Sequence, residues 1–304
     1  MYFCRVPLVY AFFDFDDTLL HGDSILFWLR FYYGQKPWRR FFQILNWAGV
    51  LLYILRCIDS ATLKRIFLMP MAYEDPSELD RLGEIFVRED LTRRFYTPIL
   101  QRLWTHHRLG HHIVVVSASA TFYLRHLKLL LPMAEILGTE MTWPKKGWLR
   151  LPGFLGGNLR GGNKILRLQT LGFIENPPLS FAYSDHDHDV PLLLFAKFPV
   201  CVRPNAKLRT VAEEKNWPVW DWPRETPLWR ERLVRLCLLL FSVGPAPIAE
   251  SISATGAESL ADNAESDYRA LRERVHAKYP EAWHPEIFQR IFGNERLVNA
   301  PRGP

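Results

Sequence analysis

Three aspartates stand close together near the start of the chain, in the run Asp14-Phe15-Asp16-Asp17-Thr18. A carboxylate at the end of a strand can attack an electrophile, and a second carboxylate two residues further on can protonate the leaving group and later activate water. A surface acidic turn has the same composition without any chemistry. These five residues alone therefore leave both interpretations open.

A serine and a lysine further along the chain stand at positions suited to a phosphate group. Ser117 follows the β-branched run 113–116, and its hydroxyl and the next backbone N–H groups can hold a phosphate oxygen. Lys164 follows Gly161-Gly162-Asn163 where a helical pattern begins, so its charge can neutralise a phosphoryl group during transfer. Taken singly, a strand-end serine is more often a helix N-cap, and a lysine is more often a solvated surface residue.

A second acidic cluster extends from Ser184 to Asp189. Its carboxylates suit Mg²⁺, which prefers hard oxygen ligands. The spacing of His186 and His188 suggests zinc instead, but no further nitrogen or sulfur ligand has suitable spacing. We interpret the two other histidine pairs, His106-His107 and His111-His112, as solvated residues of a helix end and a loop.

These candidate residues fall where strands end in an alternating pattern of strands and helices. Apolar runs predict buried strands over 8–15, 113–116, 179–183 and 199–202. Strands that alternate with helices predict a parallel sheet, which places ligands at the carboxyl ends of its strands. We expect helices over 25–33, 41–57, 60–69 with Ser60 as N-cap, 77–96, 98–107 and 121–131, and a hairpin or loop over 143–162.

The stretch 24–107 is helical throughout and too long for a single crossover, so it predicts a separate domain. The expected fold class is α/β, with a doubly wound, Rossmann-like parallel-sheet core formed by residues 1–23 and 108–225. An all-helical cap, residues 24–107, is inserted after the first strand. Residues 226–304 form a C-terminal extension, with an apolar run at 236–243, a loosely ordered linker at 251–267 and a polar helix at 268–278.

The composition of the 304 residues, 48% hydrophobic and 23% charged, fits a globular protein with a sizeable core. The net charge of +6 permits anionic partners, but no Lys/Arg block is dense enough to predict nucleic-acid binding. The four cysteines, Cys4, Cys57, Cys201 and Cys237, lack C-x-x-C spacing, which favours a reducing compartment. We therefore expect a cytoplasmic protein.

Residues 41–55 carry no charge and are bracketed by Arg39, Arg40 and Arg56. At about 15 residues this run is shorter than the roughly 18–20 that span a bilayer. The simpler interpretation is a buried cap helix. The alternative is a helix on an anionic bilayer surface, with the segment 230–243 as a second weak anchor, which predicts peripheral contact with the inner face of the membrane.

Taken together, the motifs occur in the order Asp-x-Asp-x-Thr, strand-end Ser, Lys and Asp-x-x-x-Asp. In this order the sequence resembles the haloacid dehalogenase-like phosphatases, in particular the branch of the phosphoserine phosphatases and their relatives, which include phosphatidylglycerophosphatase C-like proteins. The resemblance rests on FFDFDDTLLHGDS, VVVSASATFYL, GGNKILRLQ and YSDHDHDVPLL, and it covers about residues 8–221.

The resemblance implies a catalytic role for four residues. Asp14 would be the nucleophile that forms an aspartyl phosphate, and Asp16 would be the general acid and base. Ser117 and Lys164 would hold and neutralise the phosphoryl group. The fold implied is an α/β core with a helical cap, as the pattern of strands and helices also predicts.

The resemblance also implies a Mg²⁺ site and a substrate site. Mg²⁺ would be bound by Asp14, the backbone carbonyl of Asp16 and Asp185, with Asp189 supporting the site. The residues implied in substrate binding are Thr18, Asp23, Ser117, Ala118 and Lys164.

The sequence departs from the family pattern by two small changes: Asp17 and Ser184 stand where the family has Gly. Asp23 stands where phosphoserine phosphatases tend to have a Glu that reads the substrate amine, which speaks against phosphoserine. We expect a Mg²⁺-dependent phosphomonoesterase that acts through an aspartyl phosphate on a lipid-linked or glycerol-type phosphate. The alternatives are a small-metabolite phosphatase, such as a phosphoserine phosphatase, and a non-catalytic protein of this family that binds a membrane or a partner.

Overall fold

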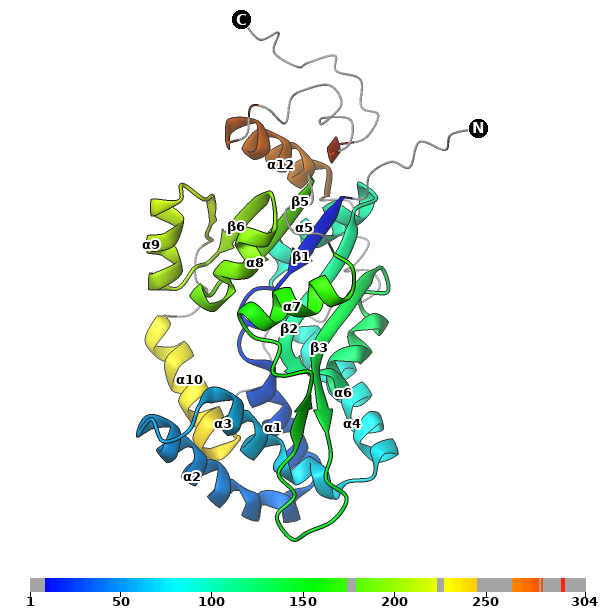
Figure 1. The fold of residues 1–304 in the computed structure, drawn as a ribbon, viewed down its shortest axis with the longest axis vertical. Helices are drawn as coiled ribbons and strands as arrows, with labels where there is room; N and C mark the ends of the chain where they lie inside the picture. The colour runs from blue at the N-terminus through cyan, green and yellow to red at the C-terminus, as the bar shows by residue number, and fades with distance from the viewer. Residues whose placement is uncertain are drawn as a thin grey trace, which may run out of the picture.

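A twisted sheet of seven strands forms the centre of the computed structural model, which describes residues 9–173, 179–222, 227–244, 264–278, 280 and 291–292 (Figure 1). Its order is β4-β3-β2-β1-β5-β6-β7. The parallel strands are β1 (Tyr10–Phe13), β2 (His112–Ala120), β3 (Ala134–Thr142), β5 (Ser180–Ser184), β6 (Phe198–Val202) and β7 (Val219–Trp220). The remaining strand, β4 (Gly153–Leu155), is antiparallel to β3.

This topology confirms the predicted doubly wound α/β fold. The chain builds the sheet outward from β1 in both directions, so the strand order reverses beside β1, and ligands bind at such a reversal. The four predicted strands are present, with Leu8 lying outside the described residues. Strand β3 was not predicted, because Glu135, Gly138 and Glu140 interrupt its apolar residues.

Both faces of the sheet are covered by helices, and side chains alternate between them along each strand. On one face, Ala11, Phe13, Val115, Phe181 and Tyr183 join the core that includes α5 (Thr97–Arg108) and α12 (Ala264–Lys278). On the other face, Phe12, Val114, Val116 and Ala182 pack with α7 (Gly162–Thr170), α8 (Val190–Phe195) and α9 (Ala206–Glu214). Burial on both faces explains why these strands are continuous apolar runs in the sequence.

The helices between β1 and β2 lie largely at the end of the sheet where β1 leads into its following loop (Figure 1). They are α1 (Ser24–Gln35), the 3₁₀ helix Pro37–Phe42, α2 (Gln43–Ile54), α3 (Ser60–Leu68), the 3₁₀ helix Met69–Tyr73, α4 (Pro76–Glu89), the 3₁₀ turn Leu91–Arg93 and α5. Helix α5 belongs to the sequence range predicted as cap, yet it packs on β2 and α12. The domain boundaries stay a prediction.

Several local predictions need correction. The N-cap of α3 is Asp59, whose Oδ1 accepts the Thr62 N–H at 2.8 Å, and not Ser60. The predicted helix 121–131 is a short α6 (Thr121–Leu124) followed by a 3₁₀ helix, Arg125–Leu129. Residues 143–162 contain the turn of the β3–β4 hairpin, as one of the two interpretations expected.

The predicted burial of residues 41–55 is wrong for most of its apolar side chains. Helix α2 buries only Gln43, Asn46, Gly49 and Val50, and two of these are polar residues. Asn46 donates to the Tyr33 hydroxyl at 3.1 Å. Because α2 packs against the rest of the protein only through this narrow inward face, the apolar residues on its other sides remain exposed.

The prediction of solvated histidines is wrong for His106 and His111, which are both buried against the sheet. Their Nδ1 atoms lie 2.7 Å apart, His106 Nε2 lies 2.7 Å from the Tyr183 hydroxyl, and His111 Nε2 lies 2.9 Å from the Ile291 carbonyl. The reason is the packing of α5 against the sheet, which places this pair between the core and residue 291. His107 is exposed, as predicted.

The C-terminal extension contributes two described helices, α10 (Leu228–Phe241) and α12. Helix α12 matches the predicted polar helix, and Arg102 of α5 binds its Asp267 through two hydrogen bonds of 2.7 Å. The predicted linker 251–267 lies outside the described residues up to residue 263. Within the described ranges, no helix is both long enough and apolar enough to cross a membrane.

Candidate active site

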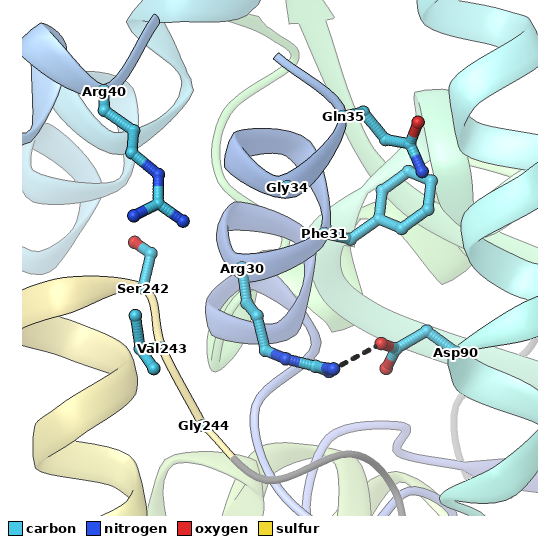
Figure 2. Close-up of a pocket in the computed structure, with 9 residues that line it drawn as sticks. All are labelled: Arg30, Phe31, Gly34, Gln35, Arg40, Asp90, Ser242, Val243 and Gly244. Atoms are coloured by element: carbon cyan, nitrogen blue, oxygen red, sulfur yellow. Dashed lines mark hydrogen bonds and ion pairs between the residues drawn. The ribbon is translucent and has the colours of Figure 1, made fainter. Parts of the chain in front are cut away.

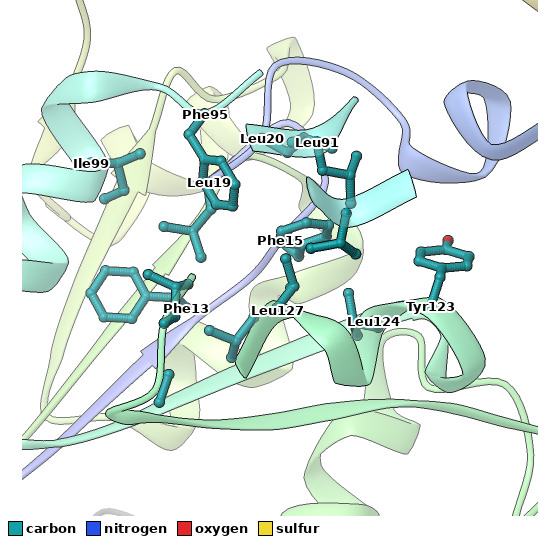
Figure 3. Packing of buried hydrophobic residues seen from close by; sticks show 14 of the residues in the cluster. Phe13, Phe15, Leu19, Leu20, Leu91, Phe95, Ile99, Tyr123, Leu124 and Leu127 are labelled. Carbon is teal, nitrogen blue, oxygen red and sulfur yellow. The ribbon is translucent and has the colours of Figure 1, made fainter. Parts of the chain in front are cut away.

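The loop after β1 places three aspartates at the carboxyl end of the sheet. The Asp14 N–H donates to the Tyr183 carbonyl at 3.0 Å, which continues the β1–β5 ladder by one residue. The N–H groups of Leu19 and Leu20 both donate to the Phe15 carbonyl at 2.9 Å, which closes the loop on itself. Figure 3 shows Phe15 and these leucines buried in the core, so the aspartates are carried on a packed loop.

Asp14 and Asp189 share the ammonium group of Lys164. Lys164 Nζ donates to Asp14 Oδ1 at 2.5 Å and to Asp189 Oδ2 at 2.7 Å, and all three residues are buried. Ser184 Oγ donates to the same Asp189 oxygen at 2.9 Å. Although burial alone lowers the pKa of Lys164, the two carboxylates raise it, so the lysine stays charged beside the predicted nucleophile.

Lys164 reaches this position because α7 begins directly after a turn with positive φ. Gly161 has φ +58°, and a Cβ there would lie 3.3 Å from the His188 carbonyl oxygen. Glycine therefore permits both the turn and the close approach of the two chain segments. The sequence prediction that Lys164 lies just inside a helix is confirmed.

Asp16 is held by hydrogen bonds from two different parts of the chain. Its Oδ1 accepts the Ser24 N–H at 2.7 Å at the start of α1, and its Oδ2 accepts the Ser119 hydroxyl at 2.5 Å. Ser117 Oγ is more distant from Oδ2, at 3.4 Å. Ser119 was not singled out from the sequence, although its spacing of two residues from Ser117 places both on the same face of β2.

Thr18 joins the two acidic clusters. Its buried hydroxyl lies 3.1 Å from Asp14 Oδ2 and 3.2 Å from Asp185 Oδ1, and it accepts the Asp185 N–H at 3.1 Å. A hydroxyl with these partners orients two carboxylates. The structure therefore brings together Asp14, Thr18, Lys164, Asp185 and Asp189, which come from three separate sequence motifs.

Burial and mutual repulsion disfavour negative charge on these carboxylates. Burial raises the pKa of Asp14 to about 7, with Lys164 acting in the opposite direction. Burial and the neighbouring carboxylates raise the pKa of Asp185 well above its usual range. Burial also raises the pKa of Asp16, although it accepts hydrogen bonds. A cation bound among them would relieve this repulsion.

The donors available in this cluster are oxygens, which fit Mg²⁺. One oxygen of Asp14 and one of Asp185 both lie within hydrogen-bond distance of the Thr18 hydroxyl, which holds the two carboxylates near each other. A tighter group of metal-binding side chains lies next to it, where ligand atoms of His186, Asp187 and His188 come within 4.8 Å of one another. Its side chains are partly exposed, and the Asp187 carboxylate already accepts the Asn205 amide at 2.7 Å.

The cap contributes a lysine that the sequence analysis did not identify. Lys64 of α3 donates to the Ala118 carbonyl and, at 3.0 Å, to Asn158 Oδ1. Burial lowers its pKa to about 8, while Asp16 and Asp23 raise it. The predicted substrate residue Ala118 thus lies where cap and core meet. No local signal separates Lys64 from other helical lysines.

Asp23 has a structural contact of its own as the N-cap of α1, where its Oδ1 accepts the Ile25 N–H at 2.9 Å. Burial and the charges of Asp16 and Asp17 raise its pKa to about 7. Its side chain is half-buried beside the loop 14–20, called the catalytic loop because it carries the predicted catalytic aspartates. A role in reading a substrate stays a prediction.

The C-terminal extension also reaches the catalytic loop. Arg235 of α10 forms an ion pair with Asp17, and Glu231, one turn earlier, lies 3.7 Å from His21 Nε2 and 3.9 Å from the Arg203 guanidinium. These contacts were not predicted, because the resemblance ended before α10. They add a third element to the surroundings of the site, besides the core and the cap.

Comparison with known proteins agrees with this geometry. The family model of the haloacid dehalogenase-like hydrolases matches residues 11–194. A histidinol-phosphatase of Neisseria meningitidis is 25% identical over 228 residues, which cover 70% of this chain and 98% of that protein. A phosphoserine phosphatase of Mycobacterium tuberculosis is 25% identical over 229 residues, which cover 70% of each chain.

A solved structure shares the fold. The crystal structure of a protein of unknown function from Bordetella pertussis superposes with a TM-score of 0.59 at 23% identity, covering 70% of this chain and 99% of that one. The fold and the acidic site thus define a hydrolase with a doubly wound core and a helical cap. The chain belongs to the haloacid dehalogenase-like hydrolases, and within that family it is a phosphoric monoester hydrolase.

Proposed function

We propose that this protein is a Mg²⁺-dependent phosphomonoesterase that works through an aspartyl phosphate on Asp14. The observation that carries the proposal is the placement of Lys164, 2.5 Å from Asp14 Oδ1 in a buried site. A cation held at the carboxylate that accepts the phosphoryl group offsets the negative charge of both partners during transfer.

The chemistry divides between two aspartates. An Asp14 oxygen attacks phosphorus, the bond from phosphorus to the ester oxygen breaks, and Asp16 gives its proton to the departing alcohol. Asp16 then takes a proton from water, which attacks phosphorus and releases inorganic phosphate and Asp14. Burial raises the pKa of Asp16, which supports a protonated starting state for this residue.

The other predicted residues have supporting roles in this proposal. Asp14, the backbone carbonyl of Asp16 and Asp185 would hold Mg²⁺, which supplies positive charge to the phosphoryl oxygens. Ser117 and Lys164 contact the phosphoryl group, and Asp189 orients Lys164 across a distance of 2.7 Å. Thr18 fixes the two ligand carboxylates relative to each other.

The substrate class follows from the surroundings of the site. Lys64, half-buried where the cap meets the core, supports an anionic group next to the phosphate. The relatives named above suggest histidinol phosphate or phosphoserine as small substrates. We favour a lipid-linked or glycerol-type phosphomonoester, because α10, which exposes several apolar residues, is ion-paired with the loop of the site through Arg235 and Asp17.

A phosphate-release assay tests the proposal. Histidinol phosphate, phosphoserine, glycerol 3-phosphate and lysophosphatidic acid are each supplied with Mg²⁺, and again with excess EDTA. We expect release from at least one of them with Mg²⁺ only, and full activity in EDTA would refute the metal requirement. The cytoplasmic location, which rests on the cysteine pattern, is proposed with the function.

A further inference from the structure

The cap and the C-terminal extension expose a large apolar surface on α2 and α10. On the 3₁₀ helix before α2, on α2 and just after it, the exposed apolar side chains include Phe41, Ile44, Trp47, Leu51, Ile54 and Leu55, between 44% and 69% exposed. On α10 they are Trp229, Leu233, Leu236 and Phe241, between 49% and 67% exposed. We call these ten residues the apolar face. Contiguous apolar surface of this kind marks an interaction site.

The two halves of the apolar face are joined where α10 ends. Gln43 Nε2 donates to the Leu240 carbonyl at 3.0 Å and to the Ser242 hydroxyl at 3.1 Å. The rings of Trp47 and Phe241 lie 6.4 Å apart. Figure 1 shows α10 lying beside the cap helices. The two helices therefore form one surface, although 173 residues lie between them in the sequence.

The charges around the apolar face are basic. Arg40, Arg56, Arg230 and Arg232 are exposed, and none of them forms an ion pair with a residue that the structure describes. The sequence has no acidic residue from 36 to 58. The only acid of α10, Glu231, points toward His21 and Arg203 on the other side of the helix.

Two pockets lie at the borders of this surface. One, of about 330 Å³, is lined by Arg30, Arg40, Ser242 and Val243 among others, and Figure 2 shows the Arg40 side chain extending toward Ser242 while Arg30 is paired with Asp90. The other is lined by Tyr53, Ile54, Arg56, Cys57, Ile58 and Asp59. Each pocket therefore contains one arginine, Arg40 or Arg56, that forms no ion pair with a described residue and can contact an anionic head group.

We propose that the protein docks on an anionic lipid bilayer through the apolar face. An amphipathic surface with aromatic and aliphatic residues at its centre and arginines at its edge is suited to the boundary between head groups and acyl chains. Two anchors of this kind bind together where one alone is weak. A second copy of the chain fits less well, because pairing two such faces would bring the four arginines of each copy together without acids between them.

Docking also sets the position of the active site. The side of α10 opposite to the apolar face carries Arg235, which is paired with Asp17 of the catalytic loop. The catalytic loop thus lies one helix diameter, about 10 Å, from the docked surface. Resting on the proposed function, this assigns as substrate class a phosphomonoester whose alcohol is a membrane lipid.

The test is cosedimentation of the full chain with vesicles of phosphatidylcholine, with and without about one third phosphatidylglycerol. We expect the wild type to bind the anionic vesicles. The double variant Leu51→Glu with Ile54→Glu should partition at least about tenfold more weakly, because negative charge on the apolar face opposes its insertion into the bilayer. Leu129→Glu is the matched control, because Leu129 is 48% exposed but lies outside the apolar face. It should bind like the wild type.

A water-soluble phosphomonoester, para-nitrophenyl phosphate, separates this inference from the proposed function. All variants should hydrolyse it equally, whereas the double variant should lose activity on lysophosphatidic acid presented in vesicles. Wild-type protein that stays in the supernatant overturns the docking, as does unchanged binding of the double variant. A dimer that the double variant dissociates, without vesicle binding, would show that a second copy covers the face. If the wild-type protein binds the anionic vesicles but does not hydrolyse para-nitrophenyl phosphate, only the proposed function is refuted.

Discussion

Arg235 of the C-terminal helix α10 is ion-paired with Asp17 of the catalytic loop, across 217 intervening residues. Asp17 has φ +58°, a left-handed conformation that glycine adopts at least cost. The charges of Asp17 and Asp23 favour the charged form of Arg235 and raise its pKa further. Helix α10 therefore takes part in holding the loop that carries Asp14 and Asp16.

We predict that Arg235→Gln weakens catalysis on a soluble phosphomonoester. The pair is partly exposed, so its loss is worth up to about 1 kcal/mol, or roughly fivefold in kcat/KM. Steady-state kinetics on purified enzyme measure the change. Arg232→Gln on the same helix is the control, since Arg232 contacts nothing in the loop, and equal kinetics in the two variants would contradict the role of Arg235.

Substitution of the two catalytic aspartates should separate the steps of the reaction. We expect Asp14→Asn to lower turnover at least about a thousandfold and to prevent any covalent phosphoenzyme, because the nucleophile is lost. Asp16→Asn should still form phosphoenzyme but hydrolyse it about a hundredfold more slowly, because the attacking water lacks its general base. Labelled phosphate in the denatured protein, or trapping with beryllium fluoride, measures the intermediate. Label on any other residue would contradict the assignment of Asp14.

Removal of the lysine charge should have a pH-dependent effect on stability. Lys164→Met leaves Asp14 and Asp189 buried without their cation, which should lower the free energy of unfolding by about 3–5 kcal/mol at pH 8. Burial already holds the folded-state pKa of Asp14 near 7, above the unfolded value. Since Lys164 lowers the pKa of Asp14, its removal should raise that pKa further, so the folded variant binds more protons than the folded wild type at pH 8. The loss of stability should therefore be smaller at pH 5.5 than at pH 8.

Chemical denaturation of Lys164→Met at pH 8 and pH 5.5 measures this difference. The double variant with Asp189→Asn should recover part of the stability at pH 8, because one of the two unpaired charges is gone. Lys145→Met, at an exposed position of the β3–β4 hairpin, is the control and should have no effect at either pH. A penalty for Lys164→Met that is equal at both pH values would contradict the argument.

The buried histidines predict acid sensitivity of the fold. Two neutral rings satisfy all three contacts of the pair when the Tyr183 hydroxyl donates to His106, His106 Nδ1–H donates to His111, and His111 Nε2–H donates to the Ile291 carbonyl. Burial lowers the pKa of His111 to about 4 and that of His106 well below its usual value. Protonation of both rings would place two N–H groups against each other at the Nδ1–Nδ1 contact.

Since the unfolded histidines bind protons near pH 6.5 and the folded ones do not, stability should fall as the pH decreases from 6.5 toward 4. Each histidine contributes about 1.4 kcal/mol per pH unit to this slope. Denaturation of the wild type and of His111→Gln across this range measures it, and the variant should have the shallower slope. His107→Asn, at an exposed neighbouring position, is the control, and a slope unaffected by His111→Gln would contradict the prediction.

The sequence by itself determined the sheet core and the residues at its carboxyl edge. Burial on both faces makes four strands, β1, β2, β5 and β6, recognisable as apolar runs in the sequence. A polar residue such as Asp14, Ser117 or Asp185 stands at the end of the run. Lys164 was placed because glycines mark the start of its helix. Strand β3, with an interrupted apolar pattern, lacked such a signal, and its pairing with β2 and β4 makes it a strand.

Only the tertiary structure decided which of the remaining polar and apolar residues meet. Three residues from other segments approach the aspartates: Ser119, Lys64 and Arg235. The residues next to them in the sequence give no indication of these contacts. The histidine pair became buried because α5 packs on the sheet, and α2 became exposed because its inward face is narrow. The hydrophobic effect is not directional and favours burial against any apolar partner. Hydropathy therefore identifies an apolar helix but not the surface that covers it.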